Sequence, residues 1–151
     1  MIACATLQLS GCNGRKAEPA STNQQAVLQG QLPYNPLAWR VITSSINKSA
    51  ATTSTLYGND AAVSYARSND GSDYLAGSVL ALVTWAERDD PHWFGAKIPG
   101  TPRSVEFVSF GGNGAAPAYS VYRGTPLAIT ASDDAAQRSE FITHQRAAVM
   151  P

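Results

Sequence analysis

"GSVLALVTWAE", residues 77–87, is the stretch that decides the fold of this 151-residue chain. Successive side chains of a β-strand point to opposite faces of its sheet, and here both sets are apolar. The two sets are Val79, Ala81, Val83 and Trp85 on one face and Leu80 and Leu82 on the other. A strand that is apolar on both faces is typical of the centre of a sheet covered on both sides. The sequence therefore predicts a central strand over 77–87.

Further segments with strand patterns lie on both sides of this one. Alternation and β-branched or aromatic residues predict strands at 37–46, 52–59, 104–110 and 118–124. Asn59 is placed to cap a helix over 60–68, and "EFITH", 140–144, is expected to form the last strand. "GGNG", 111–114, reads as a hairpin turn. The predicted fold class is α+β, a mainly antiparallel sheet with one or two short flanking helices.

The stretch 87–103 contains three prolines and is expected to be a long connection, with Trp93 and Phe94 packed over the core. It includes a D-D-x-H cluster of Asp89, Asp90 and His92, whose oxygen and imidazole groups suit a divalent ion. No second ligand cluster accompanies it, so a solvated turn shaped by Pro91 is the favoured interpretation.

Charge and cysteine content exclude several classes of function. Eleven basic residues balance eleven acidic ones without clustering, which argues against nucleic acid as a partner. Both cysteines, Cys4 and Cys12, precede residue 13, so the rest of the chain has no disulfide and no thiol ligand. We expect no metal site and no catalytic residue. A hydrolytic pairing of His144 with Asp133 or Asp134 lacks the G-x-S-x-G motif that would support it.

The N-terminal segment predicts where the protein is located in the cell. Leu9-Ser10-Gly11-Cys12 resembles the lipobox of bacterial lipoproteins, in which the cysteine is acylated and anchors the protein in the membrane. The predicted organisation is a truncated lipoprotein signal peptide at 1–11, a flexible polar tether at 12–33, a folded domain at 34–146 and a tail at 147–151. The segment 1–11 lacks the Lys or Arg of a usual signal peptide, and a cytosolic protein with an apolar N-terminus is the alternative. The expected location is the bacterial cell envelope, facing the periplasm.

Several segments in order resemble the cytochrome P-460 family of bacterial haem proteins. They are "AWRVITSS", "LYGNDAAVSYARS", "YLAGSVLALVTWAE", "PHWFGAKIPGTPRSVEFV" and "RSEFITH", and the resemblance spans about residues 34 to 146. It implies a mainly antiparallel, often dimeric domain that oxidises hydroxylamine or binds small gases such as nitric oxide at a haem.

The same resemblance places the haem attachment of the family, a C-x-x-C-H motif, at 129–133, just before "RSEFITH". Ile129, Ser132 and Asp133 then stand where the two cysteines and the axial histidine are expected, and Leu82 stands where some members have a haem-linked lysine. Covalent attachment is excluded because no cysteine follows Cys12.

The leading hypothesis from sequence is therefore a lipid-anchored cytochrome P-460-like domain that has lost its haem. It acts as a binding or structural module, and its former cavity is filled by Leu80 and Leu82 or open to a small apolar ligand. The alternative is a noncovalent haem protein with redox or gas-binding activity, in which His144 or His92 is the ligand.

Overall fold

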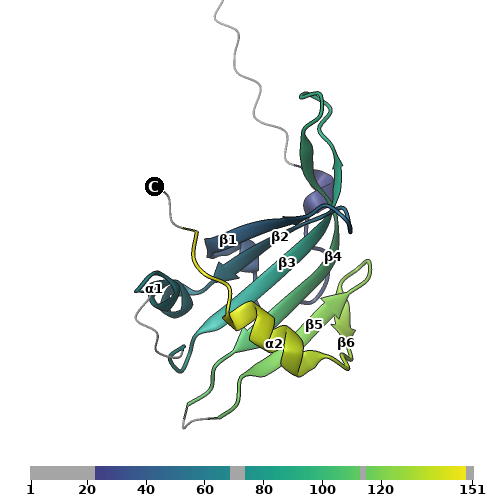
Figure 1. Ribbon diagram of the computed structural model, residues 1–151. Helices are drawn as coiled ribbons and strands as arrows, with labels where there is room; N and C mark the ends of the chain where they lie inside the picture. Colours follow the sequence, from purple (N-terminus) through teal and green to yellow (C-terminus); the bar gives the residue numbers. More distant parts are fainter. Residues whose placement is uncertain (1–22, 69–73, 113–114, 149–151) are drawn as a thin grey trace, which may run out of the picture.

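The computed structural model describes residues 23–68, 74–112 and 115–148 and contains one antiparallel sheet of six strands in sequence order (Figure 1). The strands are β1 (Arg40–Asn47), β2 (Thr52–Gly58), β3 (Val79–Asp89), β4 (Lys97–Ser109), β5 (Ala118–Arg123) and β6 (Ala128–Thr130). The helices are α1 (Asp60–Ser68), α2 (Ala135–Thr143) and two short 3-10 turns, η1 (Gln24–Ala26) and η2 (Pro36–Ala38). The predicted α+β class with an antiparallel sheet and two short helices is confirmed.

The central strand β3 is buried on both faces, as its two apolar sets predict. Leu80 and Leu82 pack in a core cluster with Leu56 of β2 and Ile142 of α2. Val83 and Trp85 pack on the opposite face, where Leu28 and Leu32 of the N-terminal segment cover them. Helices thus cover one face of the sheet, and extended chain covers the other.

Asn59 caps α1 as predicted and also ties the helix to the start of β3. Its Oδ1 accepts hydrogen bonds from the backbone N–H groups of Ala62 and Val79, each at 3.1 Å. Its amide nitrogen donates to the carbonyl of Gly77 at 2.8 Å. One side chain therefore fixes the first turn of α1 beside the beginning of the central strand.

The prediction of a last strand at 140–144 is wrong, because this segment is the second half of α2. The residues before it, from Ala135 to Glu140, are mostly good helix formers, and a window of five residues conceals that context. Within the helix Ile142 is fully buried against the sheet.

The prediction of a long connection at 87–103 is also wrong, because β3 and β4 form a hairpin arm that projects from the sheet (Figure 1). Pro99 and Pro102 lie inside β4, at a part of the ladder where the register shifts twice. Irregular pairing of this kind tolerates prolines inside a strand. Trp93 and Phe94 lie at the tip of the arm, exposed, and do not pack over the core.

Three other predictions fall partly or wholly outside the described residues. The lipobox and half of the predicted tether precede residue 23, and half of the "GGNG" turn falls in the gap at 113–114. Within the described part of the chain, no helix is long and apolar enough to cross a membrane.

Candidate ligand-binding site

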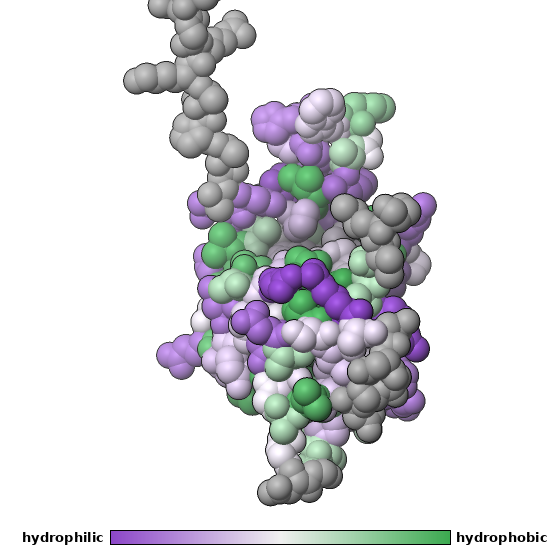
Figure 2. Space-filling view, turned by 90° about the vertical axis from the view of Figure 1, so that its left-hand side faces the viewer, coloured by the Kyte–Doolittle hydropathy of each residue, from purple (hydrophilic) through white to green (hydrophobic). Residues whose placement is uncertain are grey.

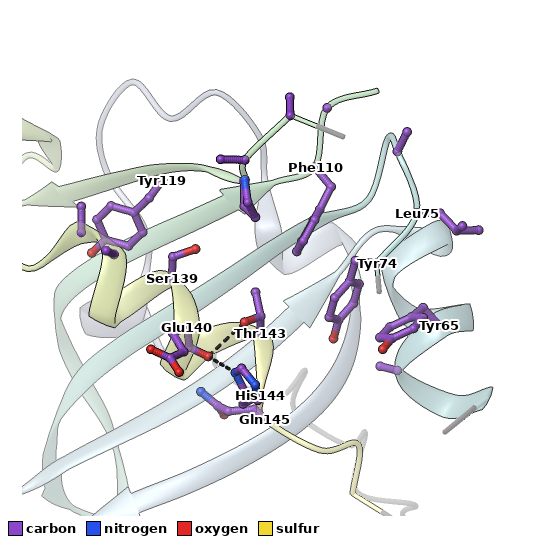
Figure 3. A pocket seen from close by; sticks show the side chains of 18 of the residues that line it. Tyr65, Tyr74, Leu75, Phe110, Tyr119, Ser139, Glu140, Thr143, His144 and Gln145 are labelled. Atoms are coloured by element: carbon purple, nitrogen blue, oxygen red, sulfur yellow. Dashed lines mark hydrogen bonds between the residues drawn. The ribbon is translucent and has the colours of Figure 1, made fainter. Parts of the chain in front are cut away.

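A pocket of about 1190 Å³ lies between α1, the loop that leads into β3, the end of β4 and α2 (Figure 3). Pockets for small molecules and cofactors span roughly 300–1,000 Å³, so the volume of this open pocket lies just above that range. Alanine and glycine residues contribute much of the lining, which leaves room between the larger side chains. These small residues are Ala66, Ala76, Gly111, Gly112, Ala115, Ala116, Ala135 and Ala136.

Three aromatic rings form one wall of the pocket. Tyr74 lies between the other two, with its ring centroid 4.2 Å from that of Tyr65 and 4.9 Å from that of Phe110. The Tyr74 and Phe110 rings are stacked, with an angle of 25° between their planes. Burial, followed by the proximity of Tyr65, raises the pKa of Tyr74 to about 12. This wall therefore stays uncharged at neutral pH and suits a flat, apolar ligand.

His144 lies at the C-terminal end of α2 and lines the same pocket. Its Nδ1 is 2.8 Å from the carbonyl oxygen of Glu140, one turn back in the helix (Figure 3). A carbonyl oxygen only accepts hydrogen bonds, so Nδ1 is the donor in this contact, and in the neutral imidazole the lone pair then lies on Nε2. Histidines that bind metals are commonly oriented in this way, by donating the other ring N–H to a backbone carbonyl or a carboxylate.

A buried ion pair fixes α2 on the sheet beside the pocket. The Glu106 carboxylate on β4 is almost fully buried and receives two hydrogen bonds from Arg138 of α2, at 2.9 and 2.7 Å. The hydroxyl of Tyr119 on β5 donates a third, at 2.6 Å. Desolvation, together with this hydrogen bond to Glu106, raises the pKa of Tyr119 to about 12. The hydrogen bond to Glu106 likewise raises the pKa of Arg138, so its guanidinium stays charged at neutral pH.

The second histidine, His92, lies far from this pocket. The pocket is next to the start of β3, whereas His92 follows the end of that 11-residue strand. At about 3.3 Å per residue the two ends are separated by roughly 33 Å. The acidic side chains of the D-D-x-H cluster bind partners within the same hairpin. Asp89 forms an ion pair with Lys97, and Asp90 accepts a hydrogen bond from the backbone N–H of His92. Among residues 23–68, 74–112 and 115–148, no group of three or more His, Cys, Asp or Glu side chains could hold a metal ion.

The residues at the expected haem positions are not part of the pocket lining. Ile129 is exposed on β6, and Ser132 and Asp133 follow in the turn before α2. None of the three lines the pocket. Leu82 is buried in the core beneath α2. The placement at 129–133 relied on a final strand at 138–144, and the helix found there removes that basis.

The pairing of His144 with an aspartate is not formed either. Asp134 precedes the first residue of α2 and His144 follows the last, so about 14 Å of helix separates them. The Asp134 carboxylate instead accepts a hydrogen bond from Ser132 at 2.5 Å.

Comparison with known proteins adds no assignment. No protein-family model matches the chain, and a search of curated proteins returns no significant match.

Proposed function

We propose that this chain is a small haem-binding protein that holds haem noncovalently in the pocket, with Nε2 of His144 as the iron ligand. The observation that carries the proposal is the position of His144. It lines a pocket of about 1190 Å³, and the carbonyl of Glu140 fixes its ring in the tautomer that leaves Nε2 available. A single imidazole suffices as the protein ligand of a haem iron, as in globins and peroxidases.

The lining fits a porphyrin in shape and chemistry. Tyr74 and Phe110 present stacked rings to a planar ligand, and the small residues leave space for its width. Bound haem would supply the redox or gas-binding chemistry that the resemblance to the cytochrome P-460 family implies.

The helix at 135–143 supports a different placement of the family motif on this chain. A C-x-x-C-H sequence that ends at His144 has its cysteine positions at Glu140 and Thr143. Residues spaced by three and four lie on one face of a helix, and all three of these residues line the pocket. On this placement the chain keeps the axial histidine and lacks the two thioether cysteines. We assign the protein to the bacterial cell envelope, because the lipobox-like Leu9–Cys12 segment predicts a lipid anchor.

Haem titration of the purified protein, followed at the Soret band, tests the proposal. We expect saturation at one haem per chain. Ala136→Trp places an indole in the pocket from an exposed position on α2 and should abolish the saturable spectral change. Ala128→Trp, on the exposed surface of β6 outside the pocket, is the matched control and should bind haem like the parent protein. Absence of a saturable change in the parent protein, or equal haem binding by the Ala136→Trp variant, would contradict the proposal.

A further inference from the structure

The turn between β3 and β4 carries two adjacent aromatic residues in full contact with solvent. Trp93 is 72% exposed, and Phe94, at 109%, is as exposed as a side chain can be. Single exposed apolar residues are common on soluble proteins and need no explanation. Two neighbouring aromatic side chains at the end of a projecting arm are different, because they form one continuous apolar tip. We call Trp93 and Phe94 the aromatic tip.

The turn has a defined backbone that holds the aromatic tip away from the body of the protein. The Asp90 N–H donates to the Ala96 carbonyl at 3.0 Å, and the Ala96 N–H donates to the Trp93 carbonyl at 3.1 Å. Gly95 has a φ of +78°, which a residue with a Cβ rarely adopts. Figure 2 shows the arm standing clear of the rest of the surface at the top of the view, with apolar and polar atoms side by side.

The composition of the arm indicates what kind of surface the tip contacts. Tryptophan is enriched at the boundary between the apolar and polar layers of a membrane, and phenylalanine is common on the membrane-facing side of interfacial segments. The nearby charges are Glu87, Arg88, Asp89, Asp90 and Lys97, which are acidic on balance. Attraction to phosphate groups is therefore absent, and insertion of apolar surface is the remaining source of affinity. A zwitterionic bilayer satisfies both conditions.

The N-terminal segment leaves the folded domain at the base of the same arm. The side-chain amide of Asn23 donates to the carbonyl of Pro99 at 2.7 Å, and Arg88 donates to Oδ1 of Asn23 at 3.2 Å. Figure 1 shows η1, which directly follows Asn23, beside the base of the arm. The first described residue of the chain is thus attached to the strands that carry the aromatic tip.

The lengths involved allow the tip and the N-terminal segment to reach one surface. Trp93 lies five residues beyond Arg88, and a chain of that length spans at most about 17 Å. Eleven residue steps separate Asn23 from Cys12, and a chain of that length reaches at most about 40 Å. An anchor at Cys12 and the aromatic tip are therefore able to contact the same membrane at the same time.

We propose that the aromatic tip inserts into the interfacial layer of a zwitterionic lipid bilayer and forms a membrane contact in addition to the N-terminal segment. This contact orients the domain with β3 and β4 directed towards the membrane. The haem pocket, at the opposite end of these strands, then faces away from it. The proposal does not depend on haem binding. The choice of a membrane as the partner rests in part on the lipid anchor proposed at Cys12, which the test removes so that the tip is measured alone.

The test uses the full chain with Cys12→Ala, so that no acyl group contributes, and vesicles of phosphatidylcholine. We expect the protein to sediment with the vesicles and the emission of Trp93 to shift to shorter wavelength, as shown by the difference from a Trp93→Phe variant. Replacing Trp93 and Phe94 together by serine should weaken partitioning by about ten-fold or more. Because the contact is apolar, added salt should not weaken it.

Ile129→Ser provides the matched control, since Ile129 is 70% exposed and lies on β6, away from the arm. Its partitioning should equal that of the parent protein. Three results would overturn the proposal: no sedimentation of the parent protein with vesicles, equal partitioning of the double serine variant, or loss of binding at raised salt. Self-association that needs Trp93 and Phe94 but no lipid would also overturn it, in favour of contact with a second copy of the chain.

Discussion

The two ends of the β3–β4 pair are built in opposite ways. At the end where β3 begins and β4 finishes, α1, α2 and the loop containing Tyr74 surround the strands and leave a pocket between them. At the other end the same two strands run beyond the sheet as a bare hairpin whose tip is exposed. One strand pair therefore lines an open pocket at one end and forms a projecting arm at the other.

This difference follows from what covers each end. Forming the pocket requires elements far apart in the sequence, which the Asn59 cap and the Glu106–Arg138 pair hold in place. The arm needs only the local ladder of two adjacent strands and the turn at Gly95. We therefore expect substitutions at the pocket end to affect stability and ligand binding together, whereas substitutions at the tip affect neither.

The largest effect is expected from placing cysteines at Glu140 and Thr143, which creates a C-x-x-C-H sequence that ends at His144. Both residues line the pocket, so their thiols would face the edge of a haem that His144 ligates. We expect covalent haem that survives denaturing electrophoresis when the variant is produced with a cytochrome c maturation system. Cysteines at Gln137 and Glu140 have the same spacing but no histidine after them, and this control should remain haem-free on the gel. A folded Glu140/Thr143 double-cysteine variant without covalent haem would contradict the placement.

Arg138→Met should destabilise the protein by about 3 kcal/mol, because it leaves the Glu106 carboxylate buried without its cation. Urea unfolding followed by circular dichroism measures this difference in the free energy of unfolding. Arg123→Met, at an exposed position on β5, is the control and should stay within about 0.5 kcal/mol of the parent protein. A fully stable Arg138→Met variant would show that the ion pair does not hold α2 in place.

Tyr119→Phe should reduce the loss of stability at high pH. The folded-state pKa of Tyr119, about 12, lies above its ordinary value of 10.0. The neutral phenol therefore contributes stability that is complete below pH 10 and is lost as the pH rises from 10 to 12. Unfolding free energies measured across this range should fall less steeply in the variant. Equal slopes in the variant and the parent protein would argue against a buried role for Tyr119.

The smallest effect is expected at the opposite end of the strands. Replacing Trp93 and Phe94 by serine should change the free energy of unfolding by less than about 0.5 kcal/mol, because neither side chain packs against the domain. The haem titration of this variant should match that of the parent protein. A substantial loss of stability would mean that the tip packs on the body, and the contrast between the two ends would then fail.

Local patterns were sufficient to predict strands at the positions of β1 to β5, but they missed β6 and placed a strand at 140–144, where the chain is helical. The two apolar sets of β3 and the Asn59 cap depend on residues that are neighbours in sequence, and the structure has both as predicted. The pocket depends on contacts between residues far apart in the sequence, such as Phe110 and Tyr74. Such contacts cannot be predicted from the local periodicity of apolar residues. The helix at the end of the chain could have been predicted in place of the strand at 140–144. Good helix formers begin at Ala135, and a helical pattern that starts there extends past Ile142 to His144. No feature of the sequence indicated that Trp93 and Phe94 are exposed, because aromatic residues are usually buried.

The most direct test of the central claim is the haem affinity of His144→Ala measured beside that of His92→Ala. The two variants remove the two histidines of the chain, one at each end of the β3–β4 pair. We expect His92→Ala to bind haem with the affinity and Soret spectrum of the parent protein. His144→Ala should bind at least about ten-fold more weakly and lose the spectral features of an imidazole-ligated iron. An unchanged His144→Ala variant would contradict the account.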